Sequence, residues 1–588
     1  MRYAWMLVAL LLAGCGSSPS AVFFDVSGGD GSGDAGAPEE DVSEEDVSEE
    51  DISEEDVSEE DVAEEDVSEE DVTEEDVAEE DVAEEDVAEE DVAEEDVAEE
   101  DVAEEDVAEE DVAEEDVSEE DVAEEDVPEE DVAEEDVPEE DVSEEDVPEE
   151  DVAEEDVPEE DTGETWTFDP VAQPESAELF PLSVQAGAMR ATSVLLWTQV
   201  STGEEVALRV WQDTAEGRLL VFEGTATPAE AGYTHAPVEG LTPGTEYQYA
   251  FFGTGEDGSL GERSAIGRFL TAWGPGVRAP ITVAATSCTN QSFRPLDAIE
   301  RMAEREDIQL FLHMGDQHYN DGSNTLEEFR NDWRSQLNER SYREMHEAVG
   351  FYQTWDDHEV DNDYDPTSIA PSTFANAEQA FYESFAIERG PGDGLWNSYV
   401  WGDTAEFIIL DSRSERYVPT EDYYISQAQM DWFLERLSSS TAHFKVVLNS
   451  VPITDMPGGY FGEGDRWEGY DGQRDQVINH IVDNDIRNVW FLSGDFHIGM
   501  VTRVNNDGGG RRIHEIAAGP GGNTNPAASL LDTLEFFSGV DQQIFHTGSF
   551  DTQVQTVLTF DPDRNEVLIR FIDADGEVLY EAWLAEGS

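Results

Sequence analysis

The chain has 588 residues, of which 147 are Asp or Glu and only 27 are Lys or Arg, so its formal net charge is −120. This composition does not fit one ordinary globular domain and argues against a basic nucleic-acid groove. The two cysteines are Cys15 and Cys288, and no disulfide can form within the chain if Cys15 is modified.

Residues 1–14 predict a lipoprotein signal peptide. Arg2 precedes an apolar run that is too short to span a bilayer but typical of a signal-peptide core. The run Leu12-Ala13-Gly14-Cys15 resembles a bacterial lipobox, which implies cleavage before Cys15 and lipidation of its thiol. Gly16 follows Cys15 where an Asp would signal retention in the inner membrane. We therefore expect an exported protein that is lipid-anchored to the outer membrane or cell surface. The alternative is a plain secretory signal with an incidental cysteine; no oligomeric state is predicted.

Residues 15–174 predict a long disordered acidic linker. From Glu39 to Asp161 a pentad such as EEDVA repeats, with three acidic residues in each copy. A five-residue period turns each Val by about 140° from the last around a helix, so no apolar stripe forms. Charge repulsion opposes compaction as well. We expect a stalk that holds a folded head away from a lipid surface; cation accumulation, or no selected role, are the alternatives.

Residues 175–274 predict a small N-terminal β-sandwich. The segments SVLLWTQV, EVALRVWQD and TEYQYAFFG alternate apolar and polar residues, as half-buried strands do. The segment LTPGTEYQY (241–249) resembles the turn and tyrosine of fibronectin-type sandwiches.

Residues 278–588 predict a larger α/β domain, because short apolar runs alternate with helical patterns. The segment 426–437 predicts a helix in which Ser426 and Gln429 form a capping box. The tail predicts hairpins that turn at DPDRN and DADG.

Polar side chains follow six of the apolar segments in this domain. Because sites in α/β folds form beyond the carboxyl ends of strands, we expect these side chains to meet at one edge of the sheet. Carboxylates gathered there require cations, and an added thiolate and phenolate favour Fe(III) as one of them. The residues at the strand ends are Cys288, Asn290, Asp316, His318, Tyr319, Asp357, His358, Asn362, Asp411, Arg413, Asn449, Asp495 and His497.

The motifs that contain these residues resemble the calcineurin-like metallophosphoesterases, specifically their PhoD-like (alkaline phosphatase D) branch. The resemblance covers roughly residues 178–588. It implies an α/β four-layer metallophosphoesterase sandwich, with mixed sheets flanked by helices, behind a fibronectin-like β-sandwich. The motifs are SCTN (287–290), GDQHY (315–319), WDDHEVDN (355–362), LDSRSER (410–416), QAQMDWF (427–433), DRWEGYDGQR (465–474) and SGDFH (493–497).

The resemblance also implies Fe3+ and Ca2+ as cofactors, with another divalent metal possible. Cys288 and Tyr319 would hold the iron, Asp316 would bridge the metals, and Asp357 would hold the second one. Asp495 and His497 would complete the site. Supporting positions are Asn290, His318, Asn362 and Asn449. The pair Gln317-His318 departs from the branch's more apolar pair, so His318 is either an extra ligand or a supporting donor.

The expected reaction is hydrolysis of phosphate monoesters, diesters or both by in-line attack of a metal-activated hydroxide. Arg413 would neutralise charge on the phosphoryl oxygens and His358 would protonate the leaving oxygen. The non-catalytic alternatives are an ion pair of Arg413 with Glu415 and a purely structural hydrogen bond of His358. The acidic body favours small esters over polyanions. The alternative function is a surface-displayed binding lipoprotein with a degenerate phosphatase domain, which a missing ligand would favour.

Overall fold

The computed structural model describes residues 166–417, 423–454, 463–505, 508–523, 544–548 and 552–588. The predicted signal peptide, Cys15 and all but the last residues of the acidic linker lie outside these ranges. Within them, none of the helices combines the length and apolar content needed to cross a bilayer.

The largest sheet has nine strands in the order β21-β20-β19-β9-β10-β11-β1-β2-β5. Its centre, β9 to β11, is parallel, and the C-terminal hairpins β19 to β21 extend one side in antiparallel fashion. The two predicted tail hairpins are therefore confirmed. The strands are β1 (Val184–Gly187), β2 (Ser193–Gln199), β5 (Tyr233–Glu239), β9 (Ile281–Thr286), β10 (Leu310–Met314), β11 (Phe351–Thr354), β19 (Val554–Asp561), β20 (Glu566–Asp573) and β21 (Val578–Ala585).

A second sheet has seven strands in the order β12-β13-β14-β15-β17-β16-β18. Its four central strands, β13, β14, β15 and β17, run parallel. The strands are β12 (Asn397–Trp401), β13 (Ala405–Ile409), β14 (Phe444–Leu448), β15 (Val489–Ser493), β16 (Gly499–Arg503), β17 (His514–Ala517) and β18 (Ile544–Gly548).

A third, five-stranded sheet belongs to the N-terminal part of the chain and has the order β4-β3-β6-β7, with β8 paired to β6. It faces β1, β2 and β5, which belong instead to the nine-stranded sheet, where Gly187 of β1 pairs in parallel with Phe351 of β11. The N-terminal strands thus extend the sheet of the larger domain directly. The strands are β3 (Val206–Thr214), β4 (Gly217–Ala226), β6 (Glu246–Thr254), β7 (Leu260–Arg263) and β8 (Gly267–Leu270).

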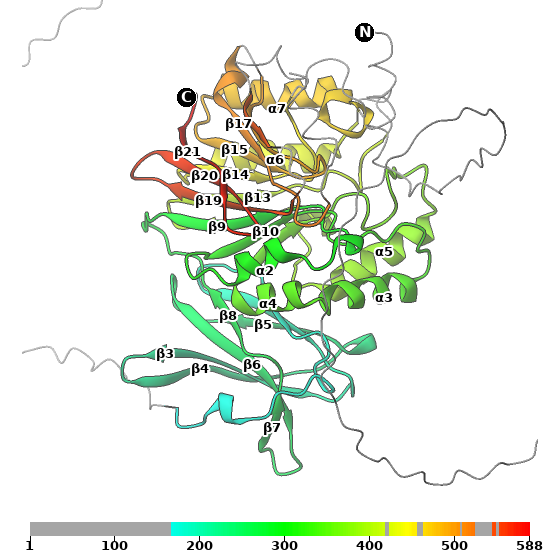
Figure 1. Cartoon of the computed structure of the whole chain (residues 1–588), viewed down its shortest axis with the longest axis vertical. Coiled ribbons are helices and arrows are strands. Elements are labelled where there is room, and N and C mark those ends of the chain that lie inside the picture. The colour runs from blue at the N-terminus through cyan, green and yellow to red at the C-terminus, as the bar shows by residue number, and fades with distance from the viewer. Residues whose placement is uncertain (1–165, 418–422, 455–462, 506–507, 524–543, 549–551) are drawn as a thin grey trace, which may run out of the picture. The chain divides into compact units, whose positions relative to one another are not determined.

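The helices cover the outer faces of the two large sheets (Figure 1). They are α2 (Asp297–Ala303), α3 (Leu326–Leu337), α4 (Arg340–Ala348) and α5 (Pro371–Ser384) on the nine-stranded sheet, and α6 (Gln427–Ser439) and α7 (Asp471–Asp483) on the seven-stranded sheet. Single turns of 3-10 helix are η1 (Pro170–Ala172), η2 (Glu230–Gly232), η3 (Gln291–Phe293), η4 (Pro391–Asp393), η6 (Glu463–Asp465), η7 (Trp467–Gly469) and η8 (Gly509–Arg512).

Alternating residues of each strand separate the cores. In β14, Val446 and Leu448 enter the core between the two large sheets, whereas Val447 packs under α6 and α7. In β10, Leu312 enters the same central core, whereas Phe311 packs under α2 to α5. Period-two strands with both faces buried produce this layering. The result is the four-layer sandwich that the family resemblance implies.

All six strands expected to deliver site residues are present, but they divide three and three between the two large sheets. The prediction that the site residues meet at one edge of a single sheet is therefore wrong, because the strands belong to two sheets. The sequence marks where each strand ends but not which strand lies beside it. The site side chains meet instead where the ends of two facing sheets converge.

Helix α6 is confirmed, although its predicted capping box is half formed. The Ser426 hydroxyl accepts from the Gln429 backbone N–H at 3.1 Å. The Gln429 side chain instead accepts from the Asp411 backbone N–H at 2.9 Å and donates to the Asp411 carbonyl at 3.1 Å. The helix thereby anchors the segment that follows β13, since both backbone groups of Asp411 are satisfied by one amide.

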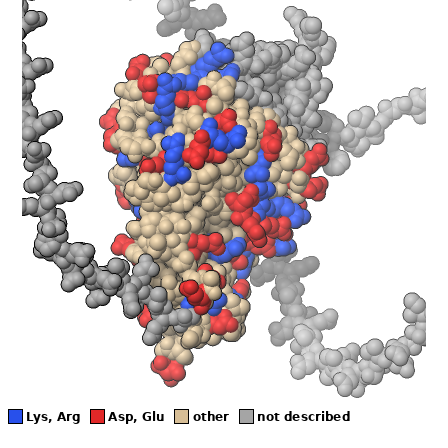
Figure 2. All heavy atoms as spheres, turned by 90° about the vertical axis from the view of Figure 1, so that its left-hand side faces the viewer, with Lys and Arg blue, Asp and Glu red and all other residues tan. Residues whose placement is uncertain are grey.

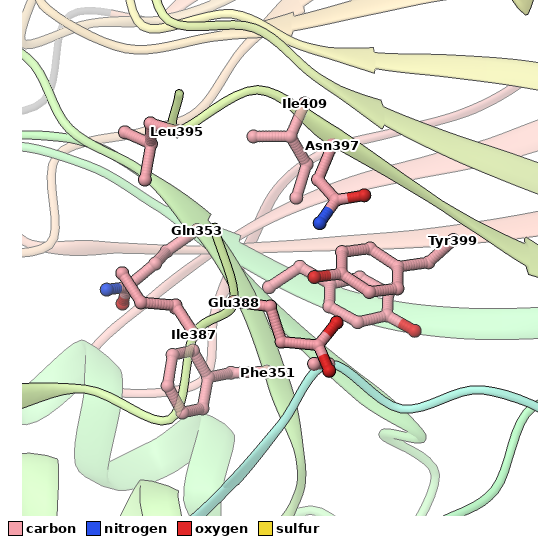
Figure 3. Close-up of a pocket in the computed structure, with 10 residues that line it drawn as sticks. Phe351, Gln353, Ile387, Glu388, Leu395, Asn397, Tyr399 and Ile409 are labelled. Carbon is pink, nitrogen blue, oxygen red and sulfur yellow. The ribbon is translucent and has the colours of Figure 1, made fainter. Parts of the chain in front are cut away.

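A small cavity lies among the side chains of β11, β12 and β13 and the residue after β1 (Figure 3). Its volume of about 10 Å³ is enough for about one water molecule. Next to it, the rings of Tyr352 and Tyr399 stack with centroids 4.2 Å apart. The Arg190 guanidinium lies 4.8 Å from the Tyr399 centroid and 3.0 Å from Glu388. This region is a packed junction rather than a ligand site.

Figure 2 shows acidic side chains interspersed with basic ones on the visible face of the molecule. Many surface arginines pair with acids, as Arg340 does with Glu344 at 2.7 Å and Arg305 with Asp307 at 2.7 Å. Mixed charges of this kind weaken the field of the folded part near its surface.

Candidate metal centre

Four of the predicted ligands occupy a strained backbone conformation. Cys288, Asp316, Asp495 and His497 have φ values of 57°, 56°, 65° and 54°. Residues other than glycine rarely adopt this left-handed region, and such residues cluster at functional sites. Each of the four lies in the turn that follows a strand, and Cys288 and Asp316 are buried there.

Two glycines allow these turns to pack closely. A Cβ on Gly315, which has φ 97°, would lie 2.6 Å from the Cβ of Asp356, and a Cβ on Gly494 would lie 2.6 Å from that of Ser287. Only a residue without a side chain fits at such distances. The glycines of the two Gly-Asp pairs therefore bring the strand ends into contact.

The first group of ligand atoms comprises Cys288 Sγ, a carboxylate oxygen of Asp316 and a ring nitrogen of His497, all within 4.8 Å of one another. Tyr319 joins this group, because its hydroxyl donates to Asp316 Oδ2 at 3.4 Å and lies 3.3 Å from His497 Nε2. The Asn523 amide lies 2.8 Å from the Tyr319 hydroxyl and 3.2 Å from His497 Nε2. One thiol, one phenol, one imidazole and one carboxylate thus converge.

The second group comprises atoms of Asp316, Asp357 and His358, again within 4.8 Å of one another. Asp316 belongs to both groups. The Asp357 carboxylate accepts from the backbone N–H groups of His358 at 3.0 Å and Asp363 at 2.6 Å. His358 Nδ1 lies 2.8 Å from the Asp321 carboxylate. The arrangement therefore has two adjacent positions for a cation, with one carboxylate between them.

The electrostatics of these groups favour bound cations. Burial and neighbouring carboxylates raise the pKa of Asp316 and Asp495 well above the usual range. Burial, reinforced by Asp316, does the same to the Cys288 thiol. Among the described residues, the buried atoms Asp316 Oδ1 and Asp356 Oδ2 have no hydrogen-bond partner. Buried carboxyl and thiol groups and two unpartnered oxygens fit a cation, which would stabilise the charged forms of these groups.

His358 is the candidate acid. Burial lowers its pKa, but Asp316, Asp357 and Asp321 together raise it to about 11. Its ring also packs against that of Tyr319, with centroids 3.8 Å apart. A cation shared by Asp316 and Asp357 would remove part of this stabilisation of the imidazolium, which leaves Asp321 as the partner that orients the ring.

Arg413 is fully buried, and its guanidinium holds carboxylates. Its Nε donates to Asp356, and its Nη1 and Nη2 donate to Asp465 at 2.5 and 3.2 Å. Asp357 lies 3.8 Å away. Arg416 also donates to Asp465. The guanidinium N–H groups that were expected to bind phosphate are thus occupied by Asp465. The alternative ion pair of Arg413 with Glu415 is not present among the described residues, because the Glu415 carboxylate accepts from the Ser426 N–H at 2.9 Å.

The remaining predicted residues lie around the two groups but not in them. Asn290 caps η3 by accepting from the Ser292 N–H at 2.8 Å. His318 lies 2.6 Å from Asn320 Oδ1 and packs toward Trp333, and burial lowers its pKa to about 4. The others are Asn362, which donates to Asp363 at 2.8 Å, Asn449, which accepts from Ser412 at 2.6 Å, and Asp495, which is buried near Asp356.

Several residues with direct contacts in the site have no role assigned from the sequence, among them Asp321, Asn523 and Asp465. Asp321 follows the GDQHY motif by two residues, and Asp465 begins the motif DRWEGYDGQR. Their motif positions are visible in the sequence, but their partners are not. Asn523 ends a glycine-rich run, GPGGN, whose backbone returns to Cys288 through a 2.9 Å hydrogen bond.

Comparison with known proteins gives the same family for both parts of the chain. A family model described as PhoD-like phosphatase matches residues 283–549, and its N-terminal-domain model matches residues 166–273. Alkaline phosphatase D of Bacillus subtilis (strain 168) is 28% identical in an alignment 399 residues long, which covers 56% of this chain and 66% of that protein. The match thus spans slightly less than two thirds of the relative's length.

Two solved structures share the fold. A structure of PhoD superposes with a TM-score of 0.59 at 22% identity, covering 71% of this chain and 95% of that one. A purple acid phosphatase from yellow lupin (Lupinus luteus) seeds superposes with a TM-score of 0.51 at 14% identity, covering 68% of this chain and 73% of that one. At these identities the likeness concerns the fold alone.

Proposed function

The chain belongs to the PhoD-like phosphatase family, and on this basis we propose that it is a metal-dependent hydrolase of phosphate monoesters, diesters or both. The observation that carries the proposal is Asp316, which belongs to two adjacent groups of possible ligand atoms. A carboxylate in that position suits a pair of cations with a shared ligand.

Cys288, Asp316, Tyr319 and His497 would hold one cation, and Asp316 and Asp357 the other. Cations bound there would supply a water of lowered pKa and neutralise charge on the phosphoryl group. Asp495 would complete the ligand set, since it is buried among the same carboxylates. The thiol and phenol favour Fe3+ in the first position and the all-oxygen donors favour Ca2+ in the second, although another divalent ion would fit there.

His358 would protonate the leaving alkoxide oxygen. Asp321 orients its ring through Nδ1, and the adjacent Asp357 fixes its backbone N–H. In the arrangement described, Arg413 acts as a positioning residue: it holds Asp356 on one side and Asp465 on the other, next to Asp357. A direct contact of Arg413 with phosphate would require Asp465 to move.

The N-terminal 165 residues lead us to propose an exported protein attached to a bacterial outer membrane or cell surface through lipidated Cys15. The acidic repeat would act as a spacer between the lipid and the phosphoesterase, because its charge opposes compaction. Small or membrane-borne phosphate esters are the expected substrates.

The proposal is tested by metal analysis together with hydrolysis of p-nitrophenyl phosphate and bis(p-nitrophenyl) phosphate. We expect bound metal and turnover of at least one ester, and we expect Asp316→Asn to lose metal and at least about a hundredfold in kcat/KM. Asp431→Asn on the exposed face of α6 is the control. Wild-type protein that carries no metal, or full activity of Asp316→Asn, would overturn the proposal.

A further inference from the structure

A second cavity, of about 180 Å³, has none of the candidate metal ligands among its lining residues. It is enclosed by α5, the segment from η4 to the start of β12, and the segment after β13. Its floor is buried, including Trp355, Leu395 and Trp396 at 2%, 6% and 5% exposure. Gly392 and Asp393 at its rim are exposed, so the cavity is reachable from the surface of the described residues.

The charges that line this cavity have one sign. Glu378, Asp393, Asp411 and Glu415 contribute four carboxylates, and none of the described lining residues is Lys, Arg or His. One guanidinium lies nearby, since Arg389 contacts Glu378 at 2.9 Å and Asp393 at 3.7 Å. Four formal negative charges against one positive charge leave the cavity anionic.

Aromatic rings form much of the remaining wall. Trp355 packs on Phe374 and Phe381, with centroid distances of 5.8 and 5.2 Å, and Trp396 packs on Trp432 at 4.9 Å. These contacts fix the ring planes. The Arg389 guanidinium lies 3.8 Å from the centroid of Tyr382, another lining residue. The protein thus already places a cation on one of these rings, at a distance typical of a cation–π interaction.

We propose that this cavity binds an alkylammonium ion, such as a quaternary ammonium group. Carboxylates and aromatic faces together favour an organic cation, because the charge is stabilised by both and the alkyl groups replace water against the rings. A bare Mg2+ or Ca2+ ion would gain nothing from the rings and would need more oxygen ligands. A phosphate or carboxylate would be repelled.

The cavity adjoins the metal centre through two shared loops. Trp355 immediately precedes Asp356 and Asp357, and its Nε1 donates to Asp411 Oδ1 at 3.0 Å. The same oxygen accepts from the Arg413 backbone N–H at 3.2 Å. The bound ammonium group could therefore be a free ion or the charged end of a phosphate ester. Only this second source rests on the proposed phosphoesterase function.

Binding is tested by isothermal titration of the full-length protein with tetramethylammonium in about 0.15 M NaCl, which screens weak contacts with the acidic linker. Tyr382→Leu should weaken binding about tenfold, and Glu378→Gln at the rim should weaken it about threefold. Glu344→Gln is a matched control: Glu344 is also a half-exposed helical glutamate paired with an arginine, with 36% side-chain exposure against 32% for Glu378. Circular dichroism verifies that the variants are folded.

Binding that falls in the two cavity variants and persists in Glu344→Gln supports the proposal. Equal binding by all four proteins, or none, overturns it. Because titration needs no turnover, Asp316→Asn should still bind tetramethylammonium even though its hydrolysis fails.

Steady-state kinetics distinguish the two sources of the ammonium group, a free ion and the charged end of an ester. If tetramethylammonium raises KM for p-nitrophenyl phosphorylcholine but not for p-nitrophenyl phosphate, the cation arrives on the ester; if neither KM changes, the site takes a free ion.

Discussion

The buried Arg413 and the partly buried Asp465 form a bidentate ion pair, with Nη1–Oδ1 and Nη2–Oδ2 distances of 2.5 and 3.2 Å, beside the candidate ligand Asp357. The pair lowers the pKa of Asp465 although burial alone would raise it. Asp465 lies in η6, far in sequence from Arg413, so the pair fastens the segment before α7 to the metal centre.

Asp465→Asn should therefore destabilise the fold, because two guanidinium groups would lose the carboxylate that they share. Removing one partner of a buried pair typically costs about 3–5 kcal/mol. Urea unfolding should show a lower midpoint for this variant. Asp563→Asn, which removes an exposed partner of Arg278 at 3.8 Å, should change the midpoint little. Equal midpoints for the two variants would show that the buried pair is not a structural constraint.

Cys288→Ser and Tyr319→Phe should each lower the iron content of the purified protein. A thiolate and a phenolate bound to Fe3+ absorb visible light by charge transfer, so the wild-type protein should be coloured and each variant paler. Absorption spectra and metal analysis check this together. A colourless wild-type protein that is fully active and contains no iron would remove the iron assignment while leaving the two-cation proposal open to other metals.

Asp321→Asn should reduce activity in a way that depends on the leaving group. If His358 protonates the leaving oxygen, weakening its carboxylate partner matters most for alkyl esters, whose alkoxides are poor leaving groups. We expect a loss of about 10²-fold for an alkyl phosphate and a much smaller loss for p-nitrophenyl phosphate. His358→Asn should show the same pattern. A uniform loss across esters would indicate that His358 binds a cation rather than donating a proton.

The stability of the fold should depend on His346, which is 3% exposed and lies under Phe351 with ring centroids 4.9 Å apart. Burial lowers its pKa to about 3, from an ordinary value of 6.5. The unfolded chain therefore takes up the proton first, so this contribution is complete above pH 6.5 and falls as the pH decreases below it. The loss should reach ~2 kcal/mol at pH 5.

Denaturant unfolding at pH 7.5 and pH 5 measures this effect. His346→Phe, which keeps an aromatic ring in the same core, should show a smaller loss of stability between the two pH values than the wild type. His480→Gln on α7, a half-exposed position, is the control. If His346→Phe and wild type lose the same stability, the histidine is not the cause.

Deleting residues 39–161 should leave kcat on a small chromogenic ester unchanged, because the repeat has no means of forming a core and none of the candidate ligands lies in it. Steady-state kinetics of the full-length and shortened proteins provide the comparison. A large loss on deletion would mean that the repeat takes part in catalysis.

The strands and hairpins were predictable because their apolar periodicity is local, as in β14, whose residues alternate between two cores. The candidate ligands were recognisable as strand-end residues within specific motifs, and the structure brings Cys288, Asp316 and His497 together. Their partners were not recognisable. That Asp465 reaches Arg413, that Asn523 reaches Tyr319, and that β9 to β11 and β13 to β15 lie in different sheets all depend on packing between distant segments. Local sequence carries no signal for that packing.

The pairing of β1 with β11 has a practical consequence for any shortened version of this protein. Cutting the chain just before residue 283, where the phosphatase match begins, would remove β1 from one side of β11 and leave the backbone groups on that side unpaired, while β10 still covers the other side. An unpaired strand edge is a template for β-pairing with a strand of another molecule. Such a fragment would tend to self-associate even if each of its own ligands were intact, and an N-terminal boundary at residue 166 avoids this.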